Sequence, residues 1–452
     1  KQDYDCLDLN IWTKDVKTEG KPVIVFIHGG GGWQGGTYDP CYDGEFFIRN
    51  LAKGEDAVMV SFNYRLGIFG SLNLSGLEGY DEEEYGDAIN LATLDQIQAL
   101  KWVHENIAAF GGNPENVTLM GQSFGSGSAC TLLTIPEANR YFQHVILESG
   151  NIFNRQLSIE KSVENSEKVF EILGVDSVDE LMSISNEKLM EKYEKIDEEL
   201  HHPHRVADGK IIPLDGYQAI KDGVAKNIDV MIGTVSGEYD FEAIDWDNSI
   251  SEPVEDPQPI IDYLGVMQDR AGSAIVKWSP LGHDDIINEY LALDDDPVKR
   301  WADLFNDTHY RQTAIFIAEA LSKAGSDVYM YYWEWAPDKE AVLEAEGDSA
   351  EVSPWGRPMH CMEQILVFGC VEEGYPELAG PAEGIPEELL KATQLTWYSF
   401  AKEGNPNNNL IGEWNTYNTK TRETMVIGAD SSWEIQKDPR AEDRKVLDKI
   451  RP

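Results

Sequence analysis

Residues 121–125 (GQSFG) have the types and spacing of a serine nucleophile held on a tight turn, the pattern G-x-S-x-G. In this pattern the serine follows a buried strand and precedes a helix. Glycines on either side let the two elements pass closely, and strained backbone angles expose the serine hydroxyl. The free N–H groups of the helix N-terminus point toward the same place. The pattern predicts nucleophilic chemistry at Ser123.

The segments around this motif have the composition that such a turn requires. Residues 116–120 (NVTLM) are β-branched and apolar, which predicts a buried strand. Residues 125–133 (GSGSACTLL) are small and apolar, and we expect them to form a helix packed closely on that strand. The bare motif occurs by chance in many proteins, so this framing by a strand and a helix makes it informative.

A serine nucleophile needs three kinds of partner. A histidine removes the hydroxyl proton, and a carboxylate orients and stabilises the imidazolium that forms. N–H donors stabilise the negative charge that develops on the carbonyl oxygen of the substrate. In proteins with this motif a glycine-rich loop precedes the serine, and the acid and the histidine follow it in that order.

The glycine-rich loop is present at residues 28–32 (HGGGG), directly after the apolar run 22–27 (PVIVFI). A phosphate-binding loop is the alternative interpretation, but no Gly-Lys-Ser/Thr sequence follows. We therefore predict an oxyanion hole made by the backbone N–H groups of Gly30, Gly31 and Phe124, the last being the residue after the nucleophile.

His360 is the predicted base among nine histidines. It lies in a loop-like segment late in the chain, residues 355–363 (WGRPMHCME), just before an apolar stretch. The other histidines precede the serine motif, lie in predicted helices and strands, or belong to a cluster. That cluster, His201, His202 and His204, lacks the cysteine or paired carboxylate ligands of a zinc site. We predict no metal and no organic cofactor.

The predicted acid is Glu238, chosen from 81 acidic residues by its position. Residues 229–232 (DVMI) predict a strand, and Glu238 ends the loop that follows it. A carboxylate just past the carboxyl end of a strand is correctly placed in an open α/β sheet. Asp240 is the alternative acid.

Apolar runs separated by helix-like segments predict a mostly parallel α/β sheet flanked by helices. Residues 92–110 carry apolar residues three and four apart, as an amphipathic helix does. The predicted strands, besides that before the serine, are residues 22–28, 57–62, 144–147, 229–232 and 328–333.

We predict a single domain over residues 1–452, although this length would also allow two. Polar, helix-prone stretches predict helical insertions over the sheet at roughly 158–205 and 257–320. The acidic clusters at residues 81–84 and 294–296 lack the ligand spacing of a calcium loop, so a solvated surface is expected there.

The net charge of the chain limits the kinds of partner that it can bind. The sequence contains 37 basic and 81 acidic residues, a net charge of −44, and 42% hydrophobic residues. Such a chain is repelled by nucleic acid and by anionic membranes, while its apolar content is ample for a large core. No apolar run approaches the length of a membrane span. We expect a soluble protein without a nucleic-acid partner.

The five cysteines have no C-x-x-C spacing and fit neither a zinc site nor a disulfide scaffold, so most are expected to be packed thiols. The chain begins at Lys1 without a methionine, which indicates a processed or truncated form. Both cytoplasmic and secreted locations remain open, as does the oligomeric state.

Taken together, these segments resemble the type-B carboxylesterases, the cholinesterase-like branch of the α/β-hydrolase superfamily. The resemblance implies an α/β-hydrolase fold and hydrolysis of small carboxylic esters through Ser123, His360 and Glu238. It also implies that Ser149 steadies the acid and the base, although a strand-end turn serine is the alternative. The matching segments are residues 4–10 (YDCLDLN), 28–31 (HGGG), 63–70 (NYRLGIFG), 94–112, 116–128, 232–234 (IGT) and 397–406 (WYSFAKEGNP).

Two further hypotheses remain at this level. One is a non-catalytic cholinesterase-like binding or adhesion protein, since a protein can keep a fold after losing the catalytic activity associated with it. Such proteins typically lose the serine or its partners, whereas this chain retains all of them. The other is an enzyme that applies the same residues to amides or lactones.

The chain departs from the family pattern at several positions. The amino-terminal hairpin that carries the usual disulfide partner of Cys6 is missing from this sequence. Gly32 replaces an aromatic residue, so we expect a wider acyl side that bulky acyl groups can fill. Phe124 replaces a small residue, and its ring either shapes the pocket or packs. Tyr239 and Arg357 each replace a glycine, one after the acid and one three residues before the base.

Overall fold

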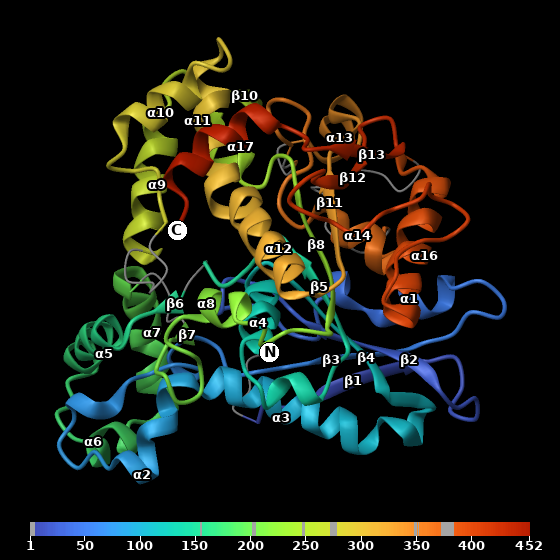
Figure 1. The fold of residues 1–452 in the computed structure, drawn as a ribbon. Helices are drawn as coiled ribbons and strands as arrows, with labels where there is room; N and C mark the ends of the chain where they lie inside the picture. Colours follow the sequence, from blue (N-terminus) through green and yellow to red (C-terminus); the bar gives the residue numbers. More distant parts are fainter. Residues whose placement is uncertain are drawn as a thin grey trace.

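The computed structural model describes residues 5–153, 156–200, 205–245, 249–271, 278–347, 350, 352–371 and 384–452. Over these residues the chain forms a nine-stranded sheet with helices on both faces (Figure 1). His201, His202 and His204 lie outside the described residues.

The strands follow the order β1-β3-β2-β4-β5-β8-β11-β12-β13. All neighbours from β3 to β12 are parallel, and only β1 and β13 at the two edges pair antiparallel. The predicted mostly parallel sheet is confirmed. The strands are β1 (Leu9–Thr13), β2 (Lys21–Ile27), β3 (Val58–Phe62), β4 (Gly112–Gln122), β5 (His144–Glu148), β8 (Asp229–Val235), β11 (Val328–Trp333), β12 (Glu423–Ile427) and β13 (Trp433–Lys437).

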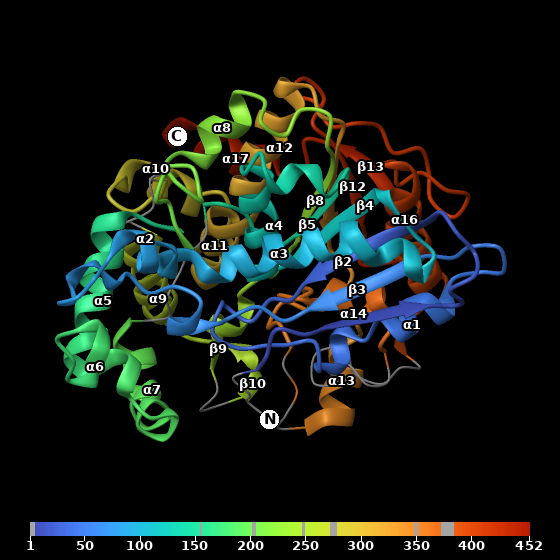
Figure 2. The ribbon, with the colours of Figure 1, turned by 90° about the horizontal axis from the view of Figure 1, so that it is seen from below.

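The central strands are buried on both faces, which explains why they are continuous apolar runs. In β2, alternate side chains enter two different cores: Val23 and Val25 enter one, and Ile24 and Phe26 enter the other. The first core also contains α3 (Leu91–Asn106), α4 (Phe124–Leu133), α8 (Gly216–Lys221) and α12 (Gln312–Ala324). The second contains α1 (Gly44–Asn50), α14 (Met362–Phe368) and α16 (Glu387–Glu403) (Figure 2).

The two stretches predicted as insertions are largely helical where they are described. The first forms α5 (Ile159–Leu173), α6 (Val178–Ser183) and α7 (Asn186–Leu200). The second forms α9 (Gln258–Ala271), α10 (Asp284–Leu291) and α11 (Pro297–Asn306). Both groups of helices lie on the left in Figure 1, with α9, α10 and α11 above α5, α6 and α7. The end of the second stretch also contains most of α12, whose Phe316 packs into the first core.

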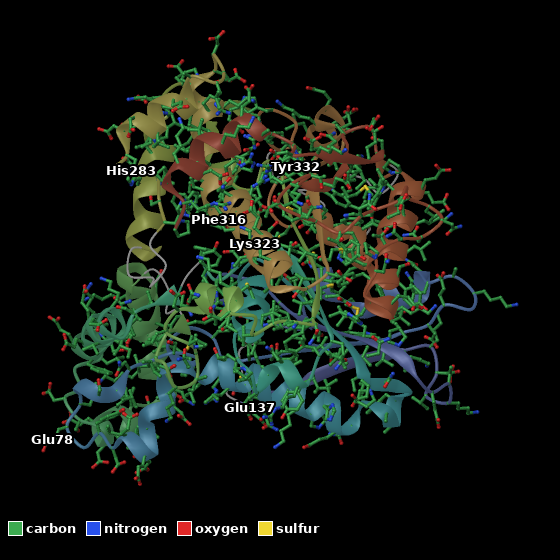
Figure 3. All side chains as sticks on the ribbon, viewed as in Figure 1. Glu78, Glu137, His283, Phe316, Lys323 and Tyr332 are labelled. Carbon is green, nitrogen blue, oxygen red and sulfur yellow. The ribbon has the colours of Figure 1, made fainter. Side chains whose placement is uncertain are left out.

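Apolar side chains fill the interior, and most of the acidic side chains lie on the surface. Figure 3 shows the placed side chains, with Phe316 in the interior and Glu78 and Glu137 exposed. Of the five cysteines, which are all free, Cys41, Cys130 and Cys370 are buried. Among the helices of the described segments, none is both long and apolar enough to cross a membrane.

Candidate active site

Ser123 lies at the turn between β4 and α4, and its φ of 56° is a strained angle for a residue with a side chain. The glycines on either side are required by close packing. A Cβ atom on Gly121 would lie 2.4 Å from the carbonyl oxygen of Gly125, and one on Gly125 would lie 2.0 Å from that of Ile27. Because these glycines have no side chains, α4 packs closely against the strands. The resulting tight turn exposes the hydroxyl of Ser123 at the carboxyl end of the sheet.

His360 connects the serine to the predicted acid. Its Nε2 lies 2.8 Å from Oγ of Ser123, and its Nδ1 lies 2.5 Å from Oε2 of Glu238. The three residues come from three separate loops, after β4, after β8 and before α14. The backbone N–H of His360 also donates to the carbonyl oxygen of Glu238 at 3.0 Å, so the two loops are joined through backbone and side chain.

This geometry fixes the direction of the hydrogen bonds. Glu238 is 1% exposed and accepts the N–H of Val235 on Oε1 at 3.1 Å, which leaves Oε2 to accept Nδ1–H of the imidazole. In the neutral imidazole, Nε2 then faces the serine hydroxyl as an acceptor. Burial alone lowers the pKa of His360, while the adjacent Cys361 side chain and the Glu238 carboxylate raise it to well above the usual value for histidine.

Asp240, the alternative acid, has a different partner. Its carboxylate is completely buried and accepts two hydrogen bonds from Arg357, Nε at 2.9 Å and Nη2 at 2.7 Å. Ser353 and Asn306 also donate to it, at 2.5 and 3.0 Å. Arg357 therefore has a structural explanation at a position where glycine was expected: its guanidinium ties the loop after Glu238 to the loop before His360.

Tyr239 forms part of an aromatic wall beside the base. Its ring lies 5.4 Å from the ring of His360 and packs against Phe241, Phe305 and Tyr310 at 4.7, 5.3 and 5.6 Å. The side chain therefore shields one side of the imidazole from water instead of displacing Glu238.

The glycine-rich loop has three consecutive residues with positive φ: Gly30 at 90°, Gly31 at 67° and Gly32 at 85°. Residues with side chains rarely adopt these angles, and a run of them turns successive N–H groups toward one side. The loop lies against the nucleophile, since a Cβ on Gly29 would be 3.1 Å from Cβ of Ser123. The N–H of Phe124 belongs to the first turn of α4, where no intrahelical acceptor exists.

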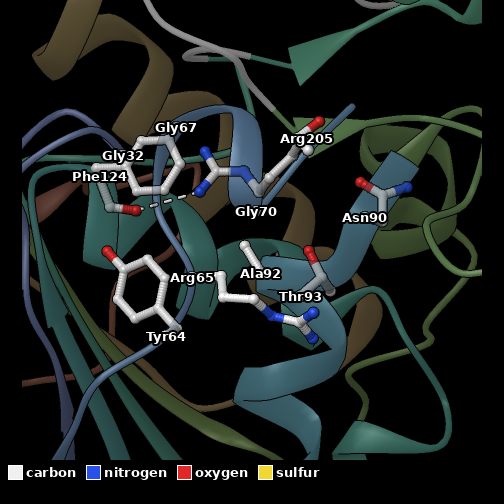
Figure 4. Close-up of a pocket in the computed structure, with 11 residues that line it drawn as sticks. Gly32, Tyr64, Arg65, Gly67, Gly70, Asn90, Ala92, Thr93, Phe124 and Arg205 are labelled. Atoms are coloured by element: carbon white, nitrogen blue, oxygen red, sulfur yellow. Dashed lines mark hydrogen bonds between the residues drawn. The ribbon is translucent and has the colours of Figure 1, made fainter. Parts of the chain in front are cut away.

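The expected room at Gly32 is absent, so the prediction of a wider acyl side is wrong. A Cβ on Gly32 would lie 2.6 Å from Cζ of Phe124, because the phenyl ring fills the space that a side chain at position 32 would need (Figure 4). In Gly32→Phe the new side chain would clash with the ring of Phe124, and its backbone would be strained at positive φ. Gly32 and Phe124, the two departures from the family pattern, therefore concern the same space.

Ser149 contacts the site through a second carboxylate that the sequence analysis did not assign. Its Oγ donates to Oε1 of Glu363 at 3.4 Å, as does the hydroxyl of Tyr331 at 3.4 Å. Glu363 is completely buried. It follows His360 by three residues, and this spacing is the feature of the sequence that could have identified it. Burial and the negative charge of Glu238 raise the pKa of Glu363 to about 7.

Glu148 is a third buried carboxylate beneath the site. Its oxygens accept Nε1–H of Trp397 at 2.6 Å and Nε2–H of Gln364 at 3.1 Å. Burial, and then the charge of Glu363, raise its pKa above the ordinary value. Since two ionised carboxylates in this interior would repel each other, the pair favours a protonated state.

Protonation of Glu363 predicts a pH-dependent stability. The folded pKa lies above the unfolded value, so this group contributes stability below pH 4.5 that is lost as pH rises toward 7. The free energy of unfolding of the protein relative to Glu363→Gln should fall by about 3 kcal/mol over this range. Urea titrations between pH 4.5 and 8 measure it.

The matched control is Glu137→Gln, because Glu137 is exposed. This variant should change the free energy of unfolding by no more than about 0.5 kcal/mol, as surface substitutions usually do. A difference for Glu363→Gln that stays constant with pH would mean that Glu363 is ionised in the folded protein.

No group of three or more His, Cys, Asp and Glu side chains that could hold a metal ion occurs within the described ranges. The assembled groups are a serine hydroxyl, an imidazole, a buried carboxylate and backbone N–H donors. Together they can move a proton from Ser123 to His360 and stabilise negative charge on a carbonyl oxygen.

Comparisons with known proteins agree with this chemistry. A family model described as "Carboxylesterase family" matches residues 1–446. The sequence is 33% identical over 460 residues to para-nitrobenzyl esterase of Bacillus subtilis (strain 168), covering 99% of this chain and 83% of that protein. It is 30% identical over 451 residues to liver carboxylesterase of Sus scrofa, covering 91% and 71%.

Solved structures are similar over the same length. A structure of PNB esterase superposes with a TM-score of 0.79 at 30% identity, covering 99% of this chain and 84% of that one. The carboxylesterase EST55 of Geobacillus stearothermophilus at pH 6.2 gives a TM-score of 0.79 at 27% identity, covering 98% and 85%.

Proposed function

This chain belongs to the carboxylesterase family and is a carboxylic ester hydrolase with an α/β-hydrolase fold, and we propose that it acts through Ser123, His360 and Glu238. The observation that carries the proposal is the unbroken hydrogen-bonded chain from Oγ through the imidazole to the carboxylate, at 2.8 and 2.5 Å. The predicted family, fold and enzyme class are confirmed, and the esterase relatives argue against a non-catalytic binding protein.

In the first half of the reaction Oγ of Ser123 attacks the carbonyl carbon of the ester while Nε2 of His360 takes the hydroxyl proton. Glu238 keeps Nδ1–H in place and stabilises the imidazolium. The carbonyl oxygen becomes negative and accepts hydrogen bonds from the N–H groups of Gly30, Gly31 and Phe124. The imidazolium then gives its proton to the alcohol oxygen, the ester C–O bond breaks, and an acyl-enzyme remains.

In the second half water replaces the alcohol. His360 removes a proton from the water as its oxygen attacks the acyl carbon, and the same N–H donors stabilise the oxyanion. The bond to Oγ breaks and Ser123 regains its proton from the imidazolium. One ester and one water give one carboxylic acid and one alcohol.

The burial of the groups supports this chemistry. Because Glu238 is 1% exposed, its charge acts on the imidazolium with little screening by water. Each donor of an oxyanion hole is worth about 2.7–4 kcal/mol of barrier in other serine hydrolases. The N–H of Phe124 adds the partial positive charge of the N-terminus of α4.

The domain organisation is part of the proposal. Strands from residue 9 to residue 437 contribute to one sheet, and the family model extends over residues 1–446. These two observations support one hydrolase domain over residues 1–452, with helical insertions within roughly 158–205 and 257–320. The net charge of −44 argues against a nucleic-acid partner, and the esterase family supports small carboxylic esters as substrates.

Labelling with a fluorophosphonate tests the assignment of the nucleophile. The probe should bind one equivalent per chain at Ser123, identified by peptide mass spectrometry, and ester hydrolysis should fall in proportion to labelling. Para-nitrophenyl and para-nitrobenzyl esters are suitable substrates, given the name of the Bacillus relative. Labelling of another serine, or hydrolysis that persists after complete labelling, contradicts the proposal. Matched amides and lactones test the remaining alternative.

A further inference from the structure

We propose that the phenyl ring of Phe124 and the guanidinium of Arg205 brace the oxyanion loop from behind, and that both are positioning residues for ester hydrolysis. The inference rests on the proposed oxyanion hole of Gly30, Gly31 and Phe124. It goes beyond that hole because it assigns a task to a side chain, Arg205, that lies far from the motifs in the sequence.

The ring of Phe124 packs directly on the backbone of the oxyanion loop. The position of a Cβ on Gly32 is 2.6 Å from Cζ and 2.7 Å from Cε2 of the ring, so no atom fits between them. The carbonyl oxygen of Gly32 also accepts the N–H of Gly67 at 2.8 Å, a second contact that holds the loop. Gly31, the preceding residue, supplies a proposed donor.

Phe124 therefore connects all three proposed donors. Its backbone N–H is one of them, while its ring contacts the loop that supplies the other two. The side chain is 8% exposed and belongs to the core that contains α3 and α4. With Gly32 and Arg205 it lines a small pocket (Figure 4), and its packing against Gly32 constrains the spacing between the donors.

Arg205 holds the ring and the start of α4 together. It comes from the short strand β7 (Arg205–Val206), is 4% exposed, and places its guanidinium carbon 4.3 Å from the centre of the Phe124 ring (Figure 4). Its Nη1 donates to the carbonyl oxygen of Phe124 at 3.2 Å and to Oγ of Ser128 at 2.8 Å. A cation over an aromatic ring is attractive, and more so when water is excluded.

The surroundings of Arg205 are built to hold it. Val206 exchanges two hydrogen bonds with the side chain of Asn90, at 2.8 and 2.9 Å, which anchors β7. A Cβ on Gly127 would lie 2.6 Å from Nη2 of Arg205, so this glycine of α4 leaves room for the guanidinium. Anchoring, space and hydrogen bonds together fix the plane of the guanidinium against the ring.

The brace predicts a specific kinetic signature. Donors that move out of line lose contact with the oxyanion, which exists only in the tetrahedral states, while the bound ester is little affected. Loss of the ring should therefore lower kcat and leave KM nearly unchanged, by the same factor for every acyl group. A ring that lined the acyl pocket would instead change the ratio between short and long acyl groups.

The experiment compares Phe124→Ala, Phe124→Leu, Arg205→Met and Arg205→Lys on para-nitrophenyl acetate, butyrate and hexanoate. We expect Phe124→Ala to lower kcat about 10²-fold for all three esters, since a misplacement of about 1 Å costs that much. Affinity for a trifluoromethyl ketone, which forms a tetrahedral oxyanion on Ser123, should fall by the same factor. Arg205→Met should show a smaller, uniform loss, and the conservative variants should recover part of each.

Phe142→Ala is the matched control, because Phe142 is a phenylalanine of the same core, 1% exposed and outside the site. It should lower the melting temperature without lowering kcat. An unchanged kcat in folded Phe124→Ala, or an altered order among the three esters, overturns the brace. If Phe124→Ala does not fold, Phe124→Leu and Arg205→Met decide the same question.

Failure of the brace and failure of the proposed function give different results. Fluorophosphonate labelling of the unsubstituted protein at a residue other than Ser123 refutes the proposed function. Labelling at Ser123, together with full activity of the Phe124 and Arg205 variants, refutes the brace alone.

Discussion

Ser123→Ala is expected to lower kcat for para-nitrophenyl acetate by about 10⁶-fold, as removal of the nucleophile does in other serine hydrolases. Without Oγ no acyl-enzyme forms, and only the N–H donors and substrate binding continue to favour attack by water. The measurement is steady-state hydrolysis by purified protein whose fold is verified by circular dichroism.

Ser126→Ala is the matched control, three residues further along the same turn and helix. Its Oγ donates to the carbonyl oxygen of Gly150 at 2.7 Å and contacts no proposed catalytic group. The variant should keep its activity within about tenfold, since it loses one buried hydrogen bond worth roughly 1 kcal/mol. Turnover that survives in folded Ser123→Ala would remove Ser123 from the proposal.

The double variant Ser123→Ala/His360→Ala sharpens the test. Because His360 acts by removing a proton from Ser123, its loss should cost nothing more once the hydroxyl is gone. A further large decrease in the double variant would mean that His360 assists a reaction that does not pass through Ser123.

The second large effect is expected for Glu238→Gln, which should lower kcat/KM by about 10⁴-fold, as the corresponding acid-to-amide change does in other triads. The amide has no charge to stabilise the imidazolium, and its NH₂ group favours the wrong tautomer of His360. The fold should survive, because the side chains are similar in size and Oε1 keeps the N–H of Val235.

Asp240→Asn is the informative comparison, since the two acids are two residues apart. Its carboxylate is paired with Arg357 and not with His360, so catalysis should change little. Stability should fall by about 2 kcal/mol, because the buried charged hydrogen bonds between Asp240 and Arg357 are weakened while Asp303 still pairs with the guanidinium. Urea midpoints and kcat/KM, measured on both variants, separate the two effects. A larger catalytic loss for Asp240→Asn would move the acid to that residue.

Much of the fold and the nucleophile could be predicted from the sequence, because the relevant signals are local. Continuous apolar runs identify strands buried on both faces, and β2, β3, β5, β8 and β11 were all predicted in this way. The turn at Ser123 is encoded by glycines within two residues of it, so its strained φ of 56° follows from a short pattern. The strands β12 and β13 were not predicted: β13, at the edge, is partly exposed and lacks a continuous apolar run, and β12 contains only a short apolar run.

The base and the acid could be predicted only in part. Order along the chain favoured His360 and Glu238, but Asp240 remained an alternative because position relative to a strand does not separate residues two apart. The folded chain separates them by their partners: His360 lies against Glu238, and Arg357 lies against Asp240. Such pairings join residues 122 and 117 positions apart, which no local pattern encodes.

What only the tertiary structure decided is how space behind the site is filled. From the sequence, Gly32 indicated an empty place and Phe124 an added ring, and the two departures were treated as independent. In three dimensions they are one contact, with the ring of Phe124 in the volume of the missing side chain and the guanidinium of Arg205 over that ring. The physical reason is that packing is a property of volumes shared by distant residues: a sequence specifies the size of each side chain, and only the fold determines which gap it fills.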